Sequence, residues 1–234
     1  AMRKKLEGRE YVENYVQTLT HEMKSPLAAI KGAAELIEPA MPADTQAKFI
    51  NNINEQSQRL QDIIERMLAL AVVEHRQTLD APRAIALANL VQEVLDARAS
   101  ILHKNAIELR FAIPLEAQVY GEPFLLQQAI GNIVDNALDF MPVSAQLHIS
   151  AIEEEQQYWQ LGIINQGPTI PDYALSRICE RFYSLPRPNS KKSTGLGLAF
   201  VSEVMSLHGG TLHISNHQQA DLAGVSVLMA LPKA

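Results

Sequence analysis

Cysteine is nearly absent from this chain of 234 residues, in which Cys179 is the single thiol. One thiol cannot form an internal disulfide, and such usage is typical of a reducing compartment. No apolar run approaches the roughly eighteen residues needed to cross a bilayer, and the N-terminus lacks the pattern of a signal peptide. We therefore expect this sequence to be soluble, with membrane attachment only through a segment that it does not include.

Basic residues are outnumbered by acidic ones. The chain has 20 Lys and Arg against 26 Asp and Glu, which gives a net charge of −6. Binding to nucleic acid usually needs a concentrated basic face, so the charge argues against a nucleic-acid partner. The length, together with 47% hydrophobic residues, is sufficient for two domains with cores of their own.

The first third of the chain has few glycines and aromatic residues and a helical apolar pattern. From about residue 9 to 76, apolar residues recur at spacings of three and four, which predicts two amphipathic helices. Pro39 and Pro42 mark the turn between them, and Asp44 is the predicted N-cap of the second helix. A hairpin cannot bury its own apolar stripe, so we expect residues 1–78 to form a four-helix bundle in a homodimer.

Composition changes near Pro82, and residues 79–234 mix helical and strand patterns. Helices are predicted at 88–102, 123–140 and 195–207, and strands at 107–111, 146–152, 158–164, 211–215 and 225–231. Because the order is not a strict βαβ alternation, we expect an α/β sandwich with helices on one face of a mixed sheet. The whole chain is then a two-domain α+β protein.

His21 lies off the apolar stripe of the first predicted helix, so it should face solvent, where an imidazole can act as a nucleophile. Glu22 is the natural general base for it. Pro26 removes a helical hydrogen bond and should bend or loosen the helix just beyond His21. A lone helical histidine is more often an ordinary surface residue, but Glu22 and Pro26 together favour the chemical interpretation.

Asn132 and Asn136 are four residues apart on a predicted helix, hence on one face, where amide oxygens can coordinate Mg²⁺ and the phosphates that it bridges. Gly167 follows an apolar strand, and Gly195 and Gly197 open a helix whose N-terminal amides can receive phosphate. Taken singly, each pattern is more often a polar helix face or an ordinary turn.

Taken in order, four segments resemble the conserved boxes of sensor histidine kinases: His21–Pro26 (HEMKSP), Asn132–Asn136 (NIVDN), Asn165–Thr169 (NQGPT) and Ser193–Leu198 (STGLGL). The resemblance extends over longer strings, at 11–30 and 170–186, and runs over essentially the whole chain. It implies a phosphoacceptor hairpin followed by an ATP-binding domain of the histidine kinase and Hsp90-like type. It also implies ATP and Mg²⁺ as cofactors, a response regulator as partner, and a place in the cytoplasmic portion of a bacterial inner-membrane sensor.

The resemblance assigns roles to single residues. It makes His21 the phosphoacceptor and Asn136 the metal ligand, and Ser25 stands where a Thr or Asn usually assists dephosphorylation of the partner. Arg181 is either a phosphate contact or a surface ion pair with Glu180 or another acid, and residues 184–193 would form a mobile lid over ATP. The residues implied in nucleotide binding are Asn132, Asn136, Phe140, Asn165, Gly167, Ile170, Arg181, Thr194, Gly195, Leu196 and Gly197.

Three residues depart from the family pattern. Asn165 stands where an aspartate accepts a hydrogen bond from the adenine amino group, and loss of charge assistance, roughly 1 to 2 kcal/mol, would lower ATP affinity about ten-fold. Thr169 replaces a usual glycine, at a position where the backbone can require a positive φ. Asp139 replaces a usual basic residue and would repel a triphosphate if it pointed inward.

These departures leave open a second interpretation, a degenerate kinase that binds nucleotide weakly or not at all. Such a protein would act as a dimeric docking module or phosphatase for its response regulator. A third interpretation, a nucleotide-binding ATPase of the related chaperone or topoisomerase kinds, is disfavoured by the helical hairpin that carries His21 and Glu22.

Overall fold

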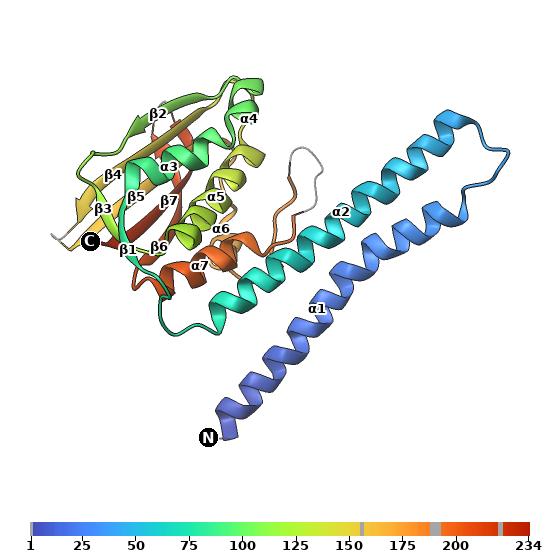
Figure 1. Cartoon of the computed structure of the whole chain (residues 1–234), viewed down its shortest axis with the longest axis horizontal. Coiled ribbons are helices and arrows are strands. Elements are labelled where there is room, and N and C mark those ends of the chain that lie inside the picture. Colours follow the sequence, from blue (N-terminus) through green and yellow to red (C-terminus); the bar gives the residue numbers. More distant parts are fainter. Residues whose placement is uncertain (1, 155–156, 188–192, 220–221) are drawn as a thin grey trace. The chain divides into compact units, whose positions relative to one another are not determined.

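The computed structural model describes residues 2–154, 157–187, 193–219 and 222–234, and the chain divides into two compact units, 1–68 and 69–234. The first unit consists of α1 (Met2–Glu35) and most of α2 (Ala43–Glu74), joined by the turn at 36–42. The second unit holds all the strands (Figure 1). A helical hairpin followed by a mixed α/β domain is therefore present, as predicted.

The turn of the hairpin differs from the prediction in one detail. The backbone N–H groups of Thr45 and Gln46 donate to the Pro42 carbonyl at 2.9 and 3.0 Å, so Pro42 caps α2. The prediction of Asp44 as N-cap was wrong, because Asp44 lies inside the first helical turn. Its negative charge there still interacts favourably with the helix dipole. In the other helix, α1 continues through the buried Pro26 without interruption. None of the helices in the described part of the chain is long and apolar enough to span a membrane.

A five-stranded mixed sheet forms the second unit, in the order β2-β4-β5-β7-β6. Strand β2 pairs in parallel with β4, and the other neighbours are antiparallel. Alternate residues of the central strands, such as Leu147 and Ile149 on β4 and Leu161 and Ile163 on β5, are buried. The strands are β2 (Glu108–Ala112), β4 (Gln146–Glu154), β5 (Tyr158–Gln166), β6 (Thr211–Gln219) and β7 (Leu222–Pro232).

Three helices, α3 (Leu87–Asp96), α5 (Pro123–Phe140) and α7 (Gly197–Leu207), lie against one face of this sheet (Figure 1). Each buries apolar residues at helical spacing, and α5 has the bounds that its sequence pattern predicts. Sequence reasoning missed the antiparallel pair β1 (Arg83–Ala86) and β3 (Gln118–Gly121), and the short α6 (Asp172–Leu175). Each of these has only four residues, too few for a periodic signal.

The single helix predicted over 88–102 is instead two, α3 and α4 (Ala99–Lys104). The break occurs at Arg98, whose backbone leaves the helical region at φ −113°. Its guanidinium donates to both carboxylate oxygens of Asp135, at 2.7 and 2.8 Å, and to the Val94 carbonyl at 2.9 Å. The break therefore coincides with a bidentate ion pair that ties the end of α3 to α5.

His208, at the end of α7, is a buried histidine with a defined tautomer. Its Nε2 accepts a hydrogen bond from the backbone N–H of Glu122 at 3.0 Å, so its Nδ1 carries the proton and donates to the Val204 carbonyl at 2.7 Å. Burial lowers the pKa of His208, and nearby Arg76 acts in the same direction, against the opposing effects of the Val204 bond and of Glu122. The folded state thus favours the neutral ring.

We expect this histidine to make stability depend on pH. Because the folded pKa is lowered, unfolded chains bind more protons below the ordinary histidine pKa of about 6.5, and the unfolding free energy falls as pH drops from 7 towards 5. His208→Gln should reduce this fall in urea unfolding experiments, whereas His213→Gln, at an exposed position of β6, should leave it unchanged. If the unfolding free energy of the His208 variant falls as much between pH 7 and 5 as that of the wild type, His208 is not the source of the pH dependence.

Candidate functional site

The phosphoacceptor candidate lies on α1. The His21 side chain is exposed, as is that of Ser25 one turn further along the helix. Glu22 is half-buried and accepts a hydrogen bond of 3.4 Å from Arg59 of α2. The hairpin thus presents an accessible imidazole beside a carboxylate that an arginine holds in place.

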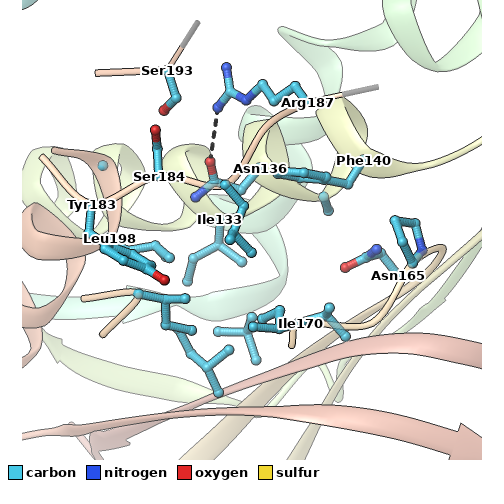
Figure 2. A pocket seen from close by; sticks show the side chains of 18 of the residues that line it. Ile133, Asn136, Phe140, Asn165, Ile170, Tyr183, Ser184, Arg187, Ser193 and Leu198 are labelled. Atoms are coloured by element: carbon cyan, nitrogen blue, oxygen red, sulfur yellow. Dashed lines mark hydrogen bonds between the residues drawn. The ribbon is translucent and has the colours of Figure 1, made fainter. Parts of the chain in front are cut away.

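A cavity of about 500 Å³ opens between α5, the sheet and the segments that follow β5 (Figure 2). Its floor is apolar, formed by side chains of the three strands β5, β6 and β7: Ile163, Ile214, Val225 and Val227. Its polar lining includes Asn136, Asn165 and Arg187. A mostly apolar cleft of this size with a few polar groups suits a small organic ligand.

Helix α5 contributes residues to the cavity at a spacing of three to four. Ile133, Asn136 and Phe140 line it, while Leu126, Ile130 and Val134 are buried in the core. Asn132 does not line the cavity; its Nδ2 donates to the Gln128 carbonyl at 3.0 Å, and its Oδ1 lies against Gly197 at the start of α7.

The glycines before α7 permit a tight contact between two backbone segments. Gly195 has φ +66° and Phe182 has φ +61°, and the Phe182 N–H donates to the Gly195 carbonyl at 2.9 Å. A Cβ at position 195 would lie 2.4 Å from the Phe182 carbonyl carbon, so only glycine fits. The hydroxyls of Ser193 and Thr194 accept hydrogen bonds from the N–H groups of Gly195 and Leu196, at 3.2 and 3.4 Å.

Asn165 is only 5% exposed and lines the cavity at the end of β5. Strand β7 pairs with β5 here and its backbone lies very close, because a Cβ at Gly224 would lie 1.9 Å from the Asn165 carbonyl oxygen. The next glycine, Gly167, donates to the Ala223 carbonyl at 3.0 Å, and a Cβ there would lie 3.0 Å from the Phe140 carbonyl oxygen. The backbone around Asn165 is therefore held from two sides.

The loop after Gly167 is fixed by a residue that sequence reasoning missed. Asn216 of β6 accepts a hydrogen bond from the Ile170 N–H and donates to the Ile170 carbonyl, both at 2.8 Å.

Thr169 is not among the described residues with positive φ, which apart from glycines are Ala106, Ser144 and Phe182. The β-branched residue at 169 is thus accommodated without left-handed strain.

Arg187 is the second residue that sequence reasoning missed. Its Nη1 lies 2.9 Å from Asp139 Oδ2, and its Nη2 donates to Asn136 Oδ1 at 3.4 Å, the contact drawn in Figure 2. An acid and a base separated by tens of residues carry no sequence signal that pairs them. The predicted lid, 184–193, falls partly outside the described residues, at 188–192.

Arg181 lies elsewhere, since it forms an ion pair with Glu74 near the end of α2 and does not line the cavity. Burial lowers the pKa of Arg181 and raises that of Glu74. The assignment of Arg181 as a phosphate contact therefore stays a prediction. Glu180 pairs with Arg177 at 3.2 Å.

The described residues hold no group of three or more His, Cys, Asp or Glu that could bind a metal by themselves. A divalent cation at Asn136 would therefore take further oxygen ligands from a bound phosphate, which is how Mg²⁺ is commonly held. The distance of 3.4 Å from Arg187 Nη2 to Asn136 Oδ1 is a weak hydrogen bond, so that oxygen remains available to a cation.

Comparison with known families agrees with this arrangement. Residues 12–76 match the His Kinase A (phospho-acceptor) domain, and residues 121–234 match the histidine kinase-, DNA gyrase B- and HSP90-like ATPase. The first match contains His21 and the second contains the whole cavity, in the order found along a kinase core. The chain belongs to the sensor histidine kinase family.

Individual sensor histidine kinases resemble it over most of its length. Sensor protein CreC of Escherichia coli (strain K12) is 48% identical over 94% of this chain and 46% of its own length. The chain spans about half the length of the curated relatives it matches.

Solved histidine kinases share its fold. Histidine kinase ThkA, in complex with the response regulator protein TrrA, aligns with a TM-score of 0.78 at 21% identity, covering 99% of this chain and 65% of that one. Acinetobacter baumannii histidine kinase AdeS aligns with a TM-score of 0.70 at 21% identity, covering 91% of this chain and 98% of that one.

The close backbone contact between Asn165 and Gly224 generates a stability prediction. Gly224→Ala should lower the unfolding free energy by about 3 kcal/mol, because its Cβ has no space and the strand must move. Gly162→Ala on β5 is the matched control, since its Cβ would meet Leu228 at an ordinary 3.4 Å and should cost less than about 1 kcal/mol. If the two variants unfold at the same urea concentration, the close contact between Gly224 and Asn165 is contradicted.

Proposed function

We propose that this chain is the catalytic core of an ATP:protein-histidine phosphotransferase. In this proposal, His21 accepts the γ-phosphoryl group of ATP and passes it to an aspartate of a response regulator. The observation that carries the proposal is the cavity, because residues predicted from three separate boxes line it together: Asn136, Asn165, Gly195 and Gly197. The exposed His21 on a family-matched hairpin supplies the acceptor.

The apolar floor and Asn165 suit the base of the nucleotide. A flat aromatic ring can pack on Ile163, Val225 and Val227, with Phe140 at the side. The amide oxygen of Asn165 can accept the hydrogen bond of the adenine amino group, although without the charge assistance of a carboxylate. ATP binding is then weaker than with aspartate but retained.

The phosphate chain would lie towards Asn136, Asn132 and the start of α7. Helix α7 has eleven residues, and its first amides add a favourable dipole for anions. Asn136 is the residue that would hold Mg²⁺, which would supply positive charge against the phosphates. These residues position and neutralise the phosphates, which is most of what phosphoryl transfer requires.

The acceptor chemistry belongs to the hairpin. The unprotonated ring nitrogen of His21 forms the new P–N bond while the bond from the γ-phosphorus to the bridging oxygen breaks, and the electron pair leaves with ADP. Glu22 takes the proton of the other ring nitrogen, and its ion pair with Arg59 orients the carboxylate. Ser25, four residues after His21 and on the same face, can orient a water for dephosphorylation of the regulator.

The alternative function is a degenerate kinase acting as a docking module or phosphatase. Two of the three departures that favoured it, Thr169 and Asp139, no longer do so. Thr169 has no left-handed strain, and Asp139 is paired with Arg187 rather than facing a triphosphate alone. Only Asn165 remains an argument for it.

The partners are also proposals. Apolar side chains exposed on the hairpin, among them Leu27, Ile64 and Leu68 at 58%, 44% and 62%, support a homodimer that buries them in a four-helix bundle. The likeness to Sensor protein CreC supports a response regulator of the CreB kind. We propose residues 1–78 as the phosphoacceptor domain, 79–234 as the ATP-binding domain, and the chain as the cytoplasmic portion of a bacterial inner-membrane sensor.

Incubation with γ-labelled ATP and Mg²⁺ tests the kinase proposal. Wild-type chain should acquire label that is acid-labile and base-stable, as expected for phosphohistidine, and His21→Ala should reduce it to background. His103→Ala, which removes an exposed histidine of α4, should label like wild type.

Absence of label in the wild type, even at millimolar ATP, would contradict the proposal. Appearance of label in Asn165→Asp alone would then place the defect at the adenine contact and favour the degenerate kinase. Label that persists in His21→Ala would mean that another residue is the acceptor.

The dimer proposal predicts that a charge on the exposed apolar stripe separates the subunits. Ile64→Glu should raise the dissociation constant of the dimer at least about ten-fold in sedimentation equilibrium, because the interface would have to bury an unpaired carboxylate. Asn51→Glu adds the same charge on the opposite, charged face of α2 and should leave the dimer intact. A monomeric wild type would refute the proposal.

A further inference from the structure

Asp139 poses an electrostatic problem for any phosphate ligand in the cavity. It lies on the last turn of α5, three residues after Asn136, so the two side chains share one side of the helix. Its side chain is 27% exposed. An unpaired carboxylate in this position would repel a triphosphate, and partial burial would reduce the screening by water.

Arg187, which lies on a different segment of the chain, forms an ion pair with this carboxylate. Its side chain is 13% exposed, lines the cavity, and contacts both Asp139 and Asn136 of α5. The contact to Asp139, at 2.9 Å, is a good charge-assisted hydrogen bond, whereas the contact to Asn136, at 3.4 Å, is weak. Asp139 therefore anchors one edge of the guanidinium and leaves the other edge able to exchange partners.

One donor of this guanidinium has no hydrogen-bond partner among the residues that the structure describes. The Nε of Arg187 is buried and makes no hydrogen bond within the described residues. A buried unpaired donor is costly, so native structures usually pair it with protein, water or ligand. The weakly engaged Nη2 of Arg187 is thus available to an anion, and the planar fork of arginine matches phosphate oxygens well.

We propose that Arg187, positioned by Asp139, is the cation that contacts the phosphate chain of the bound nucleotide. Figure 2 shows Arg187 beside Asn136, across the cavity from Asn165, so one ligand can reach Asn165 with its base and Arg187 with its phosphates. The family's usual basic residue on the helix is here replaced by an acid that holds a cation from another segment. This inference rests on the proposed ATP site.

A ligand series separates a phosphate contact from a merely structural role. By titration calorimetry with Mg²⁺ present, Arg187→Ala should weaken ATP and ADP binding at least about ten-fold and adenosine binding less than about two-fold. Arg110→Ala removes the same charge from the exposed strand β2 and should change none of these affinities. Arg187→Gln, which keeps a polar side chain with N–H donors but removes the charge, should show the same selective loss and serves if the alanine variant is unstable.

The role of Asp139 is tested by a double-mutant cycle. With Arg187 present, Asp139→Asn should lower ATP affinity, because the anchor of the guanidinium is lost. In the Arg187→Ala background, Asp139→Asn should raise ATP affinity, because it removes a negative charge that Arg187 no longer balances. Effects of the same sign in both backgrounds would overturn the positioning role.

Failure of the two proposals would look different. Wild-type chain that binds neither ATP nor adenosine would overturn the nucleotide site and this inference with it. Wild-type chain that binds both, together with an Arg187→Ala variant that loses equal affinity for both or for neither, would overturn the inference alone.

Discussion

The packing of α5 against the sheet is the constraint on which the nucleotide-binding half depends. One face of this helix buries Leu126, Ile130 and Val134, while the residues at the next positions around it face the cavity. Because both sets follow the same 3.6-residue period, rotation or translation of the helix would spoil the core and the site together. The bidentate pair between Arg98 and Asp135 fixes its position further, by tying it to α3.

Charge in the site is arranged by pairing rather than by composition. The chain is acidic overall, yet Asp139, on the same side of α5 as Asn136, is paired with Arg187, and Glu22, the neighbour of His21 in sequence, is paired with Arg59. In each pair the guanidinium offsets the negative charge and restricts the orientation of the carboxylate. Pairing of this kind lets an acidic protein offer a locally favourable environment to a polyanion.

Local periodicity predicted what depends on neighbours in sequence. The bounds of α5, the hairpin of β4 and β5 and the histidine-bearing helix follow from apolar spacing, and the resemblance located Asn136 and Asn165 in the cavity. What depends on tertiary pairing was not predictable. The break at Arg98 coincides with a partner 37 residues away, Arg187 meets Asn136 across 51 residues, and Asn216 holds Ile170 across 46.

The close contact between the backbones of Gly224 and Asn165 constrains the main chain at this point of the cavity, whereas the side chain of Asn165 supplies its polar group. Backbone contacts hold that point, through the missing side chain of Gly224 and the hydrogen bond from the N–H of Gly167 to the Ala223 carbonyl. Asparagine and aspartate have nearly the same volume, and their codons differ by one base. Under the proposed function, a single base change at this codon would therefore alter the charge offered to the nucleotide base while keeping a side chain of the same size in the cavity.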